Sequence, residues 1–142
     1  MIAYLDTSAL VPILIEESSS RACQRLWNDA DDIVAARIGY VETAAALAAA
    51  RRLRRLTTRH QRSALRTLDD LWSQMHIIEI DQPLVTRAAQ LADALSLRGY
   101  DAVHAAAAES VASGVLVAGS GDRQLLDAWS HLGVATYDTN AG

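Results

Sequence analysis

The stretch IAYLDTSAL (residues 2–10) contains the junction of a predicted strand and a predicted helix. Residues Ile2–Leu5 form a short apolar run of the kind that fits a buried strand. Asp6 follows directly, and Thr7 and Ser8 then offer side-chain oxygens that can cap a helix starting there. In an open α/β sheet, ligands bind outside the carboxyl ends of the strands, so we expect Asp6 at the edge where chemistry takes place.

The same alternation of strand and helix continues along the rest of the chain. Four further short apolar runs predict strands at Ile33–Ala36, Ile77–Ile80, Val115–Ala118 and Val134–Thr136. Segments with the 3.6-residue periodicity of helices lie at Ser18–Ala30, Ile38–Leu56, Thr58–Gln74, Gln82–Ser96, Asp101–Ala112 and Asp122–His131. Short apolar strands between helices predict an α/β fold with a central parallel sheet of about five strands, covered on both faces. We expect Gly99 and Gly114 to end the helices that precede them.

Length and composition fit a single domain over residues 1–142. Of the 142 residues, 51% are apolar and 21% are charged, which supplies a core and argues against disorder. Cys23 is the only cysteine, so neither a disulfide within the chain nor a cysteine-based zinc cluster is possible. No apolar run approaches the ~20 residues of a membrane span, and the N-terminus lacks the basic start of a signal peptide. We therefore expect a cytoplasmic protein with no membrane contact.

The basic residues exclude several classes of enzyme, because all 13 are arginines and lysine is absent. A Walker-A loop and a protein kinase both place a lysine on the nucleotide phosphates. Schiff-base chemistry needs a lysine amine as its nucleophile. The sequence therefore excludes these three mechanisms.

Four acidic residues point towards the predicted carboxyl edge of the sheet. Asp6 and Asp122 follow the first and fourth strands. Asp101 opens a predicted helix, and Glu42 lies in an apolar stretch near the start of another. Taken singly, an Asp after a strand is often only a helix cap. Together, four carboxylates at one edge repel one another unless a cation binds them. Mg²⁺ and Mn²⁺ prefer carboxylate oxygens, so a metal-assisted hydrolase acting on phosphate is the natural interpretation.

These acids lie in motifs that resemble those of the PIN-domain ribonucleases, and in particular the VapC toxins of VapBC toxin–antitoxin modules. The matching pieces are LDTSAL (5–10), VET (41–43), LRGYDAVHAA (97–106) and SGDRQL (120–125). Their order and spacing match over nearly the whole chain, and the first and third pieces are the most specific. The fourth motif of the family more often begins with threonine, and Ser120 keeps that hydroxyl.

The resemblance implies a sheet in the order 3-2-1-4-5, which puts the first and fourth strands side by side and brings Asp6 to Asp122. It also implies an endoribonuclease that depends on Mg²⁺ or Mn²⁺ and serves as the toxin of a type II toxin–antitoxin system. The metal would be bridged mainly by Asp6 and Asp101, with Glu42 and Asp122 completing the site directly or through waters. A metal-activated water would then cleave the RNA phosphodiester bond. The expected partners are a cognate VapB-type antitoxin and a second copy of the chain in a homodimer.

Four polar side chains beside the acids are predicted to support the site. Thr7 and Ser8 are helix caps by default, and the hydroxyl of Ser8 or Ser120 is also a candidate to orient a metal-bound water or a phosphate. His104 lies three residues after Asp101 on the same helix face. We expect His104 to pack at the edge of the site or to support a ligand from behind, rather than to act as the general base.

A basic segment lies apart from the acids. Residues 43–68 hold seven arginines and no acid, which leaves 6 basic and 17 acidic residues, a net charge of −11, for the rest of the chain. In continuous helical register Arg51, Arg55, Arg59 and Arg62 would form a stripe, which a turn within the segment makes approximate. A solvated helix face is the ordinary explanation of such a stripe. Because an acidic site that cuts a polyanion needs basic surface nearby, we expect the stripe to contact RNA.

Two other functions remain open. A non-catalytic α/β interaction module would retain the fold, and loss of one of the four acids would favour it, but all four are present. A phosphotransfer enzyme with Asp6 as its nucleophile would normally carry a lysine and a second Asp two residues further on. The chain has no lysine, and the second residue after Asp6 is Ser8.

Overall fold

A five-stranded parallel sheet runs through the centre of the computed structural model, which describes residues 1–141. Its strands are β1 (Ile2–Leu5), β2 (Asp32–Ala36), β3 (His76–Ile78), β4 (Leu116–Ser120) and β5 (Ala135–Asp138). They lie in the order β3-β2-β1-β4-β5, and every pairing is parallel. The expected order is confirmed, and the predicted strands differ from the observed ones only at their ends. Since β1 is the central strand, Asp6 at its carboxyl end lies in the middle of the sheet edge.

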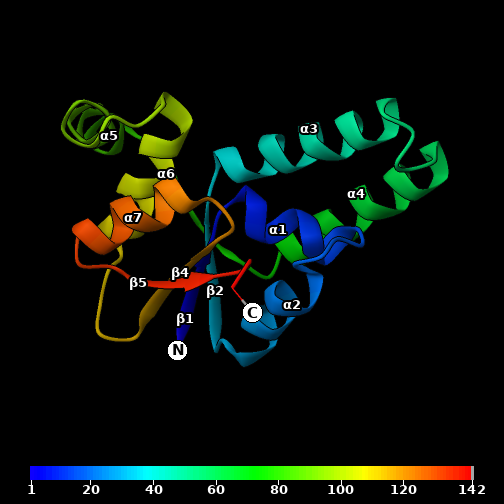
Figure 1. Cartoon of the computed structure of the whole chain (residues 1–142), viewed down its shortest axis with the longest axis horizontal. Coiled ribbons are helices and arrows are strands. Elements are labelled where there is room, and N and C mark those ends of the chain that lie inside the picture. The colour runs from blue at the N-terminus through cyan, green and yellow to red at the C-terminus, as the bar shows by residue number, and fades with distance from the viewer. Residues whose placement is uncertain (142) are drawn as a thin grey trace.

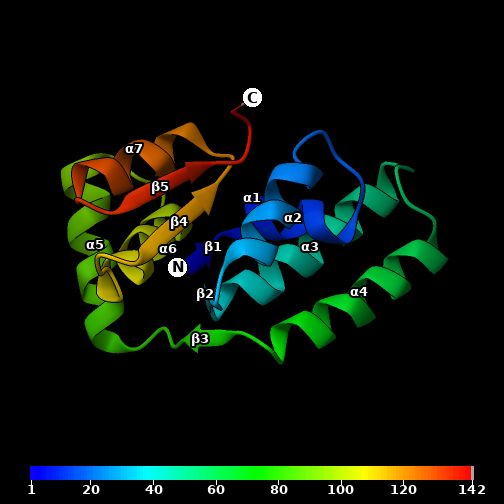
Figure 2. The same cartoon turned by 90° about the horizontal axis from the view of Figure 1, so that it is seen from below.

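Seven helices within the described residues cover this sheet (Figures 1 and 2). They are α1 (Thr7–Leu14), α2 (Ser20–Asp29), α3 (Ile38–Arg52), α4 (Thr58–Trp72), α5 (Gln82–Leu95), α6 (Gly99–Ser110) and α7 (Arg123–His131). Helices α5, α6 and α7 lie on one side, and α1 and α2 lie on the other with α3 and α4 beyond them (Figure 2). None of the described helices is both long and apolar enough to cross a membrane.

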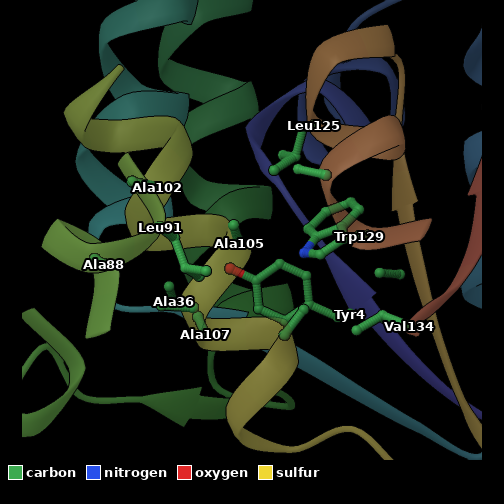
Figure 3. Packing of buried hydrophobic residues seen from close by; sticks show 14 of the residues in the cluster. Tyr4, Ala36, Ala88, Leu91, Ala102, Ala105, Ala107, Leu125, Trp129 and Val134 are labelled. Carbon is green, nitrogen blue, oxygen red and sulfur yellow. The ribbon is translucent and has the colours of Figure 1, made fainter. Parts of the chain in front are cut away.

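Successive side chains of β1 enter two separate cores, because successive residues of a strand face opposite sides of the sheet. Tyr4 lies in the core beneath α5, α6 and α7, where its ring and that of Trp129 form a T-shaped pair with a centroid distance of 5.7 Å (Figure 3). Ala3 and Leu5 lie in the opposite core with residues of α1 and α2. Burial on both faces explains why the strands are apolar along their whole length.

The two helix ends predicted from glycine are wrong. Helix α5 ends at Leu95, and its C-cap Ser96 adopts the left-handed conformation with φ of 53°. Gly99 is instead the first residue of α6. Helix α6 in turn ends before Gly114, with Val111 as its C-cap. A non-glycine residue carries the left-handed turn after α5 at a cost of about 1–2 kcal/mol, a choice that composition does not reveal.

The basic segment is not one continuous helix. A turn over residues 53–57 separates α3 from α4 and interrupts the helical register expected for the four arginines. Arg51 lies in α3, Arg55 lies in the turn, and Arg59 and Arg62 lie in α4. The prediction that the four arginines form one continuous stripe is therefore wrong. The joined ends of α3 and α4 instead form an arm, residues 47–66, that reaches away from the sheet (Figures 1 and 2).

Candidate active site

The four predicted acids line one pocket of about 460 Å³ at the carboxyl edge of the sheet. Asp6 follows β1 and Asp122 follows β4, and the pairing of these two strands brings the turns after them to the same opening. Glu42 comes from α3, and Asp101 lies in the first turn of α6. Thr7, Ser8 and His104 line the same pocket. The structure thus brings together acids from four separate segments of the chain.

Asp6 is anchored through both of its carboxylate oxygens. Its Oδ1 accepts hydrogen bonds from the backbone N–H of Ala9 at 3.1 Å and from the hydroxyl of Ser8 at 2.7 Å. Its Oδ2 accepts from the hydroxyl of Ser120 at 2.7 Å. Asp6 is therefore the N-cap of α1, and the cap predicted at Thr7 or Ser8 is wrong.

The environment of Asp6 disfavours its charge. The residue is 5% exposed, and none of the ion pairs among residues 1–141 includes it. Burial raises the pKa of its carboxyl above the ordinary value, and the charge of His104 and the hydrogen bonds from Ser8, Ser120 and Ala9 offset only part of that rise. A buried carboxylate without a basic side chain on it favours the arrival of a cation.

Ser8 and Ser120 hold Asp6 and the turn after β4 together. The Ser8 hydroxyl oxygen accepts from the backbone N–H of Gly121 at 2.8 Å, and that of Ser120 accepts from the N–H of Asp122 at 2.9 Å. The two hydroxyl oxygens lie 3.1 Å apart, and each hydroxyl donates to Asp6. In this arrangement the serines fix a carboxylate rather than a water or a phosphate.

Glu42 is held by two donors on one oxygen. The hydroxyl of Thr7 donates to Oε1 at 3.0 Å, and Nε2 of His104 lies 2.6 Å from the same atom. Partial burial raises the pKa of Glu42, but the hydrogen bond and the charge of His104, with the hydrogen bond from Thr7, outweigh it and hold the pKa below the ordinary value. Glu42 therefore stays ionised at the wall of the pocket.

Asp101 and Asp122 are each engaged through one oxygen. The Nε of Arg98 donates to Oδ2 of Asp101 at 3.1 Å, and the same guanidinium lies over the ring of Tyr100, 4.9 Å from its centre. Oδ1 of Asp122 accepts from the backbone N–H of Gln124 at 2.9 Å and so caps α7, as its place after a strand predicts. Arg98 and Tyr100 line the pocket, yet the sequence motif that contains them gave neither a role.

The donor set fits a hard divalent cation in its chemistry. Glu42 uses Oε1, Asp101 uses Oδ2 and Asp122 uses Oδ1, and no hydrogen bond within residues 1–141 reaches the second oxygen of any of the three. Carboxylate oxygens of this kind are the ligands that Mg²⁺ and Mn²⁺ prefer. The side chains do not yet form a closed cage, because no three acidic, His or Cys side chains in the described chain are grouped closely enough to hold one ion. An ion held by three or more of these acids would therefore require their side chains to move towards it.

The four arginines of the predicted stripe stay outside this pocket as far as residues 1–141 show. Arg55 is connected to it indirectly, because its guanidinium lies 3.4 Å from the carboxylate of Glu17, which lines the pocket. An RNA contact of the arm would therefore lie beside the acids rather than among them.

The family model described as PIN domain matches residues 3–128 of the chain. That range contains all four acids of the pocket. Two curated ribonucleases of Mycobacterium tuberculosis are similar to the chain, VapC45 of strain CDC 1551 / Oshkosh and VapC49 of strain ATCC 25618 / H37Rv. Each is 38% identical over 124 residues, which is 87% of this chain and 86% of the relative.

A solved structure has the same fold. The structure described as a toxin–antitoxin complex from Klebsiella pneumoniae is similar with a TM-score of 0.65 and 20% identity. The similarity covers 96% of this chain and 98% of that chain. At this identity the likeness establishes the fold alone, including the sheet that sets the position of the pocket.

Proposed function

The chain belongs to the PIN-domain family, and from that premise we propose that it is an endoribonuclease, the toxin of a type II toxin–antitoxin pair. The observation that carries the proposal is the convergence of Asp6, Glu42, Asp101 and Asp122 on one pocket. All four carboxylates line the same opening, where they can act together on one substrate. The relatives named ribonucleases cover most of the chain at 38% identity, which supports RNA as the substrate.

A divalent cation, Mg²⁺ or Mn²⁺, completes the proposed site. Asp6 and Asp101 would be its main ligands, and Glu42 and Asp122 would help to hold it. When bound, such an ion lowers the pKa of a coordinated water and stabilises negative charge on the scissile phosphate.

The other residues of the pocket prepare the acids and the substrate. Ser8 and Ser120 fix the orientation of Asp6, and His104 keeps Glu42 ionised. Arg98, once released from Asp101, is placed to donate to an RNA phosphate at the rim of the pocket. Tyr100 is 45% exposed beside it and offers a ring face on which an unstacked base can lie.

The proposed partners follow from the same family membership. The similar structure from Klebsiella pneumoniae is described as a toxin–antitoxin complex. We extend that assembly to this chain as a cognate VapB-type antitoxin and a homodimer, acting in the cytoplasm on cellular RNA.

Cleavage of RNA by the purified chain tests the proposed function. With Mg²⁺ or Mn²⁺ present, the intact chain should cleave RNA, and EDTA should abolish cleavage. Asp101→Asn should lower the rate about 100-fold or more, because metal charge stabilisation is worth several kcal/mol and each 1.4 kcal/mol is a factor of ten. Asp93→Asn on the exposed side of α5 is the matched control and should leave the rate unchanged. Equal rates for all three proteins would overturn the assignment and favour a non-catalytic interaction module.

A further inference from the structure

A hydrogen-bonded series of three residues connects the interior of the protein to the acidic pocket. The hydroxyl of Tyr4 lies 2.7 Å from Nδ1 of His104, and Nε2 of His104 lies 2.6 Å from Oε1 of Glu42. The three residues come from β1, α6 and α3, and they are distant in the sequence. Figure 3 shows the Tyr4 ring beneath α6, the helix that carries His104, with its hydroxyl oxygen directed towards that helix.

The direction of the hydrogen bond between His104 and Glu42 follows from the chemistry of the carboxylate. An ionised carboxylate only accepts hydrogen bonds, so Nε2 of His104 carries the proton that faces Glu42. The Tyr4 hydroxyl and Nδ1 of His104 form the second hydrogen bond, in which the hydroxyl donates to a neutral ring or accepts from a protonated one. Tyr4 is fully buried, and its hydroxyl can donate or accept in this contact.

The simplest alternative explanation is that Tyr4 and His104 only satisfy each other's need for a hydrogen-bond partner, since buried hydroxyls and imidazoles are nearly always paired. That alternative does not account for the third member. Tyr4 is 0% exposed and His104 is 2% exposed, yet the hydrogen-bonded series ends on the carboxylate of Glu42, which lines the pocket. Both donors on Glu42 also meet the same oxygen, Oε1, which fixes the carboxylate with Oε2 left for the pocket.

We propose that Tyr4 and His104 are positioning residues for the nuclease site, which hold Glu42 with Oε2 presented to the cation. This inference rests on the proposed function. Partners that hold the ligands of a metal from behind typically change metal affinity or activity by about 10–100-fold when they are removed. In this role both residues act through Glu42 rather than on the RNA or the ion.

Two substitutions of His104 distinguish a residue that positions Glu42 from one that only fills space in the core. Asn places its amide near the position of Nδ1, so His104→Asn keeps a partner for Tyr4 and removes the donor to Glu42. Gln reaches the position of Nε2, so His104→Gln keeps the donor to Glu42. We expect His104→Asn to lower both kcat and Mn²⁺ affinity by about 10–100-fold with KM for RNA unchanged. His104→Gln should recover most of both reductions.

Tyr4→Phe tests the buried end of the hydrogen-bonded series Tyr4–His104–Glu42. The ring stays in place and only the hydroxyl is removed, at a residue outside the lining of the pocket. The inference expects kcat and Mn²⁺ affinity to fall without a change in KM. Melting temperatures of the three variants serve as the control for folding. Reductions that are equal in His104→Asn and His104→Gln, or that rank with melting temperature alone, would overturn the inference.

An NMR measurement decides the inference independently of activity. In the intact chain, a ¹⁵N–¹H correlation spectrum should contain a slowly exchanging Nε2–H resonance, assigned to His104 by its absence from His104→Gln. The same resonance should exchange faster in Tyr4→Phe. If the intact protein lacks this resonance, the proposed positioning role of Tyr4 and His104 is overturned, whether or not the protein cuts RNA. If the intact protein shows this resonance but neither cuts RNA nor binds Mn²⁺, both the proposed function and the proposed role of Tyr4 and His104 at the metal are overturned.

Discussion

Asp6 is the residue at which the proposed function and stability oppose each other. Because burial raises the pKa of its carboxyl, folding costs free energy whenever this group is ionised. The stability that the protonated group contributes is fully present below its unfolded pKa of about 3.9. That contribution is lost as pH rises through the higher pKa of the folded state.

Asp6→Asn removes this charge and keeps the shape of the side chain. In EDTA, we expect the melting temperature of the variant to improve relative to that of the intact chain as pH rises from about 4.5 to about 7.5. RNA cleavage and Mn²⁺ binding should both be lost. Thermal unfolding followed by circular dichroism at the two pH values checks the first expectation. A constant difference in melting temperature would show that the hydrogen bonds from Ser8 and Ser120, rather than the charge, decide the effect.

Arg98 competes with the proposed cation for Asp101. The arginine side of the pair is exposed to solvent, and ion pairs of this kind are weak. Arg98→Gln should therefore raise Mn²⁺ affinity modestly, by up to about 5-fold, as measured by isothermal titration calorimetry. If Arg98 also binds RNA, the same variant should show a higher KM for RNA. Weaker Mn²⁺ binding would mean that Arg98 supports Asp101 instead of competing for it.

Helices α5 and α6 are joined by an ion pair with two hydrogen bonds. The guanidinium of Arg87 donates to both carboxylate oxygens of Glu109, each at 2.7 Å. The hydrogen bond from Arg87, with its charge, holds the pKa of Glu109 below the ordinary value. The pair therefore stabilises the fold above the unfolded pKa of about 4.3, and this contribution is lost as pH falls through the lower folded pKa.

Removing the pair should have a cost that depends on pH. Glu109→Gln is expected to lower the free energy of unfolding by about 0.2–1 kcal/mol near neutral pH and by almost nothing near pH 3. Urea unfolding at both pH values measures this, with Asp93→Asn on α5 as a control that removes an exposed charge. An equal cost at both pH values would point to packing of the side chain rather than to its charge.

Most elements were predictable from sequence because each depends on neighbouring residues. The strands are short apolar runs, and Asp122 caps α7 from the position that a strand-to-helix turn gives it. The helix ends were less predictable. Ser96, rather than Gly99, carries the left-handed turn after α5, because the surrounding fold stabilises a conformation that serine alone disfavours.

The acids of the site and the polar side chains beside them were predictable, but the contact between Tyr4 and His104 was not. Asp6, Glu42, Asp101 and Asp122 lie in recognisable motifs, and the parallel sheet brings them to one pocket. The role of Tyr4 depends on which face of β1 it occupies and on the packing of α6 against that face. Nothing in the spacing of Tyr4 and His104 along the chain signals that contact, because it exists only after the two layers are assembled.

The molecule as a whole separates its charges. Residues 43–68 carry seven arginines and no acid, while the rest of the chain carries a net charge of −11. The ends of α3 and α4 extend this basic segment away from the sheet as an arm, and the acids lie at the sheet edge (Figure 1). An acidic pocket repels RNA until a cation is bound, so a separate basic surface is the part of the molecule suited to attract the polyanion.

The salt dependence of RNA binding tests whether the arm has this role. Arg59 and Arg62 are exposed on α4, so replacing both with Gln removes two charges without touching the metal site. If each contacts a phosphate, RNA affinity should fall and the slope of log K against log salt should flatten by about 0.7–0.9 for each phosphate that is no longer neutralised. Binding is measured across a salt series in the inactive Asp6→Asn background. Arg37→Gln with Arg87→Gln removes the same charge elsewhere and should leave the slope unchanged. Parallel slopes for both double variants would exclude the arm from the RNA path and leave it as a solvated face or an antitoxin contact.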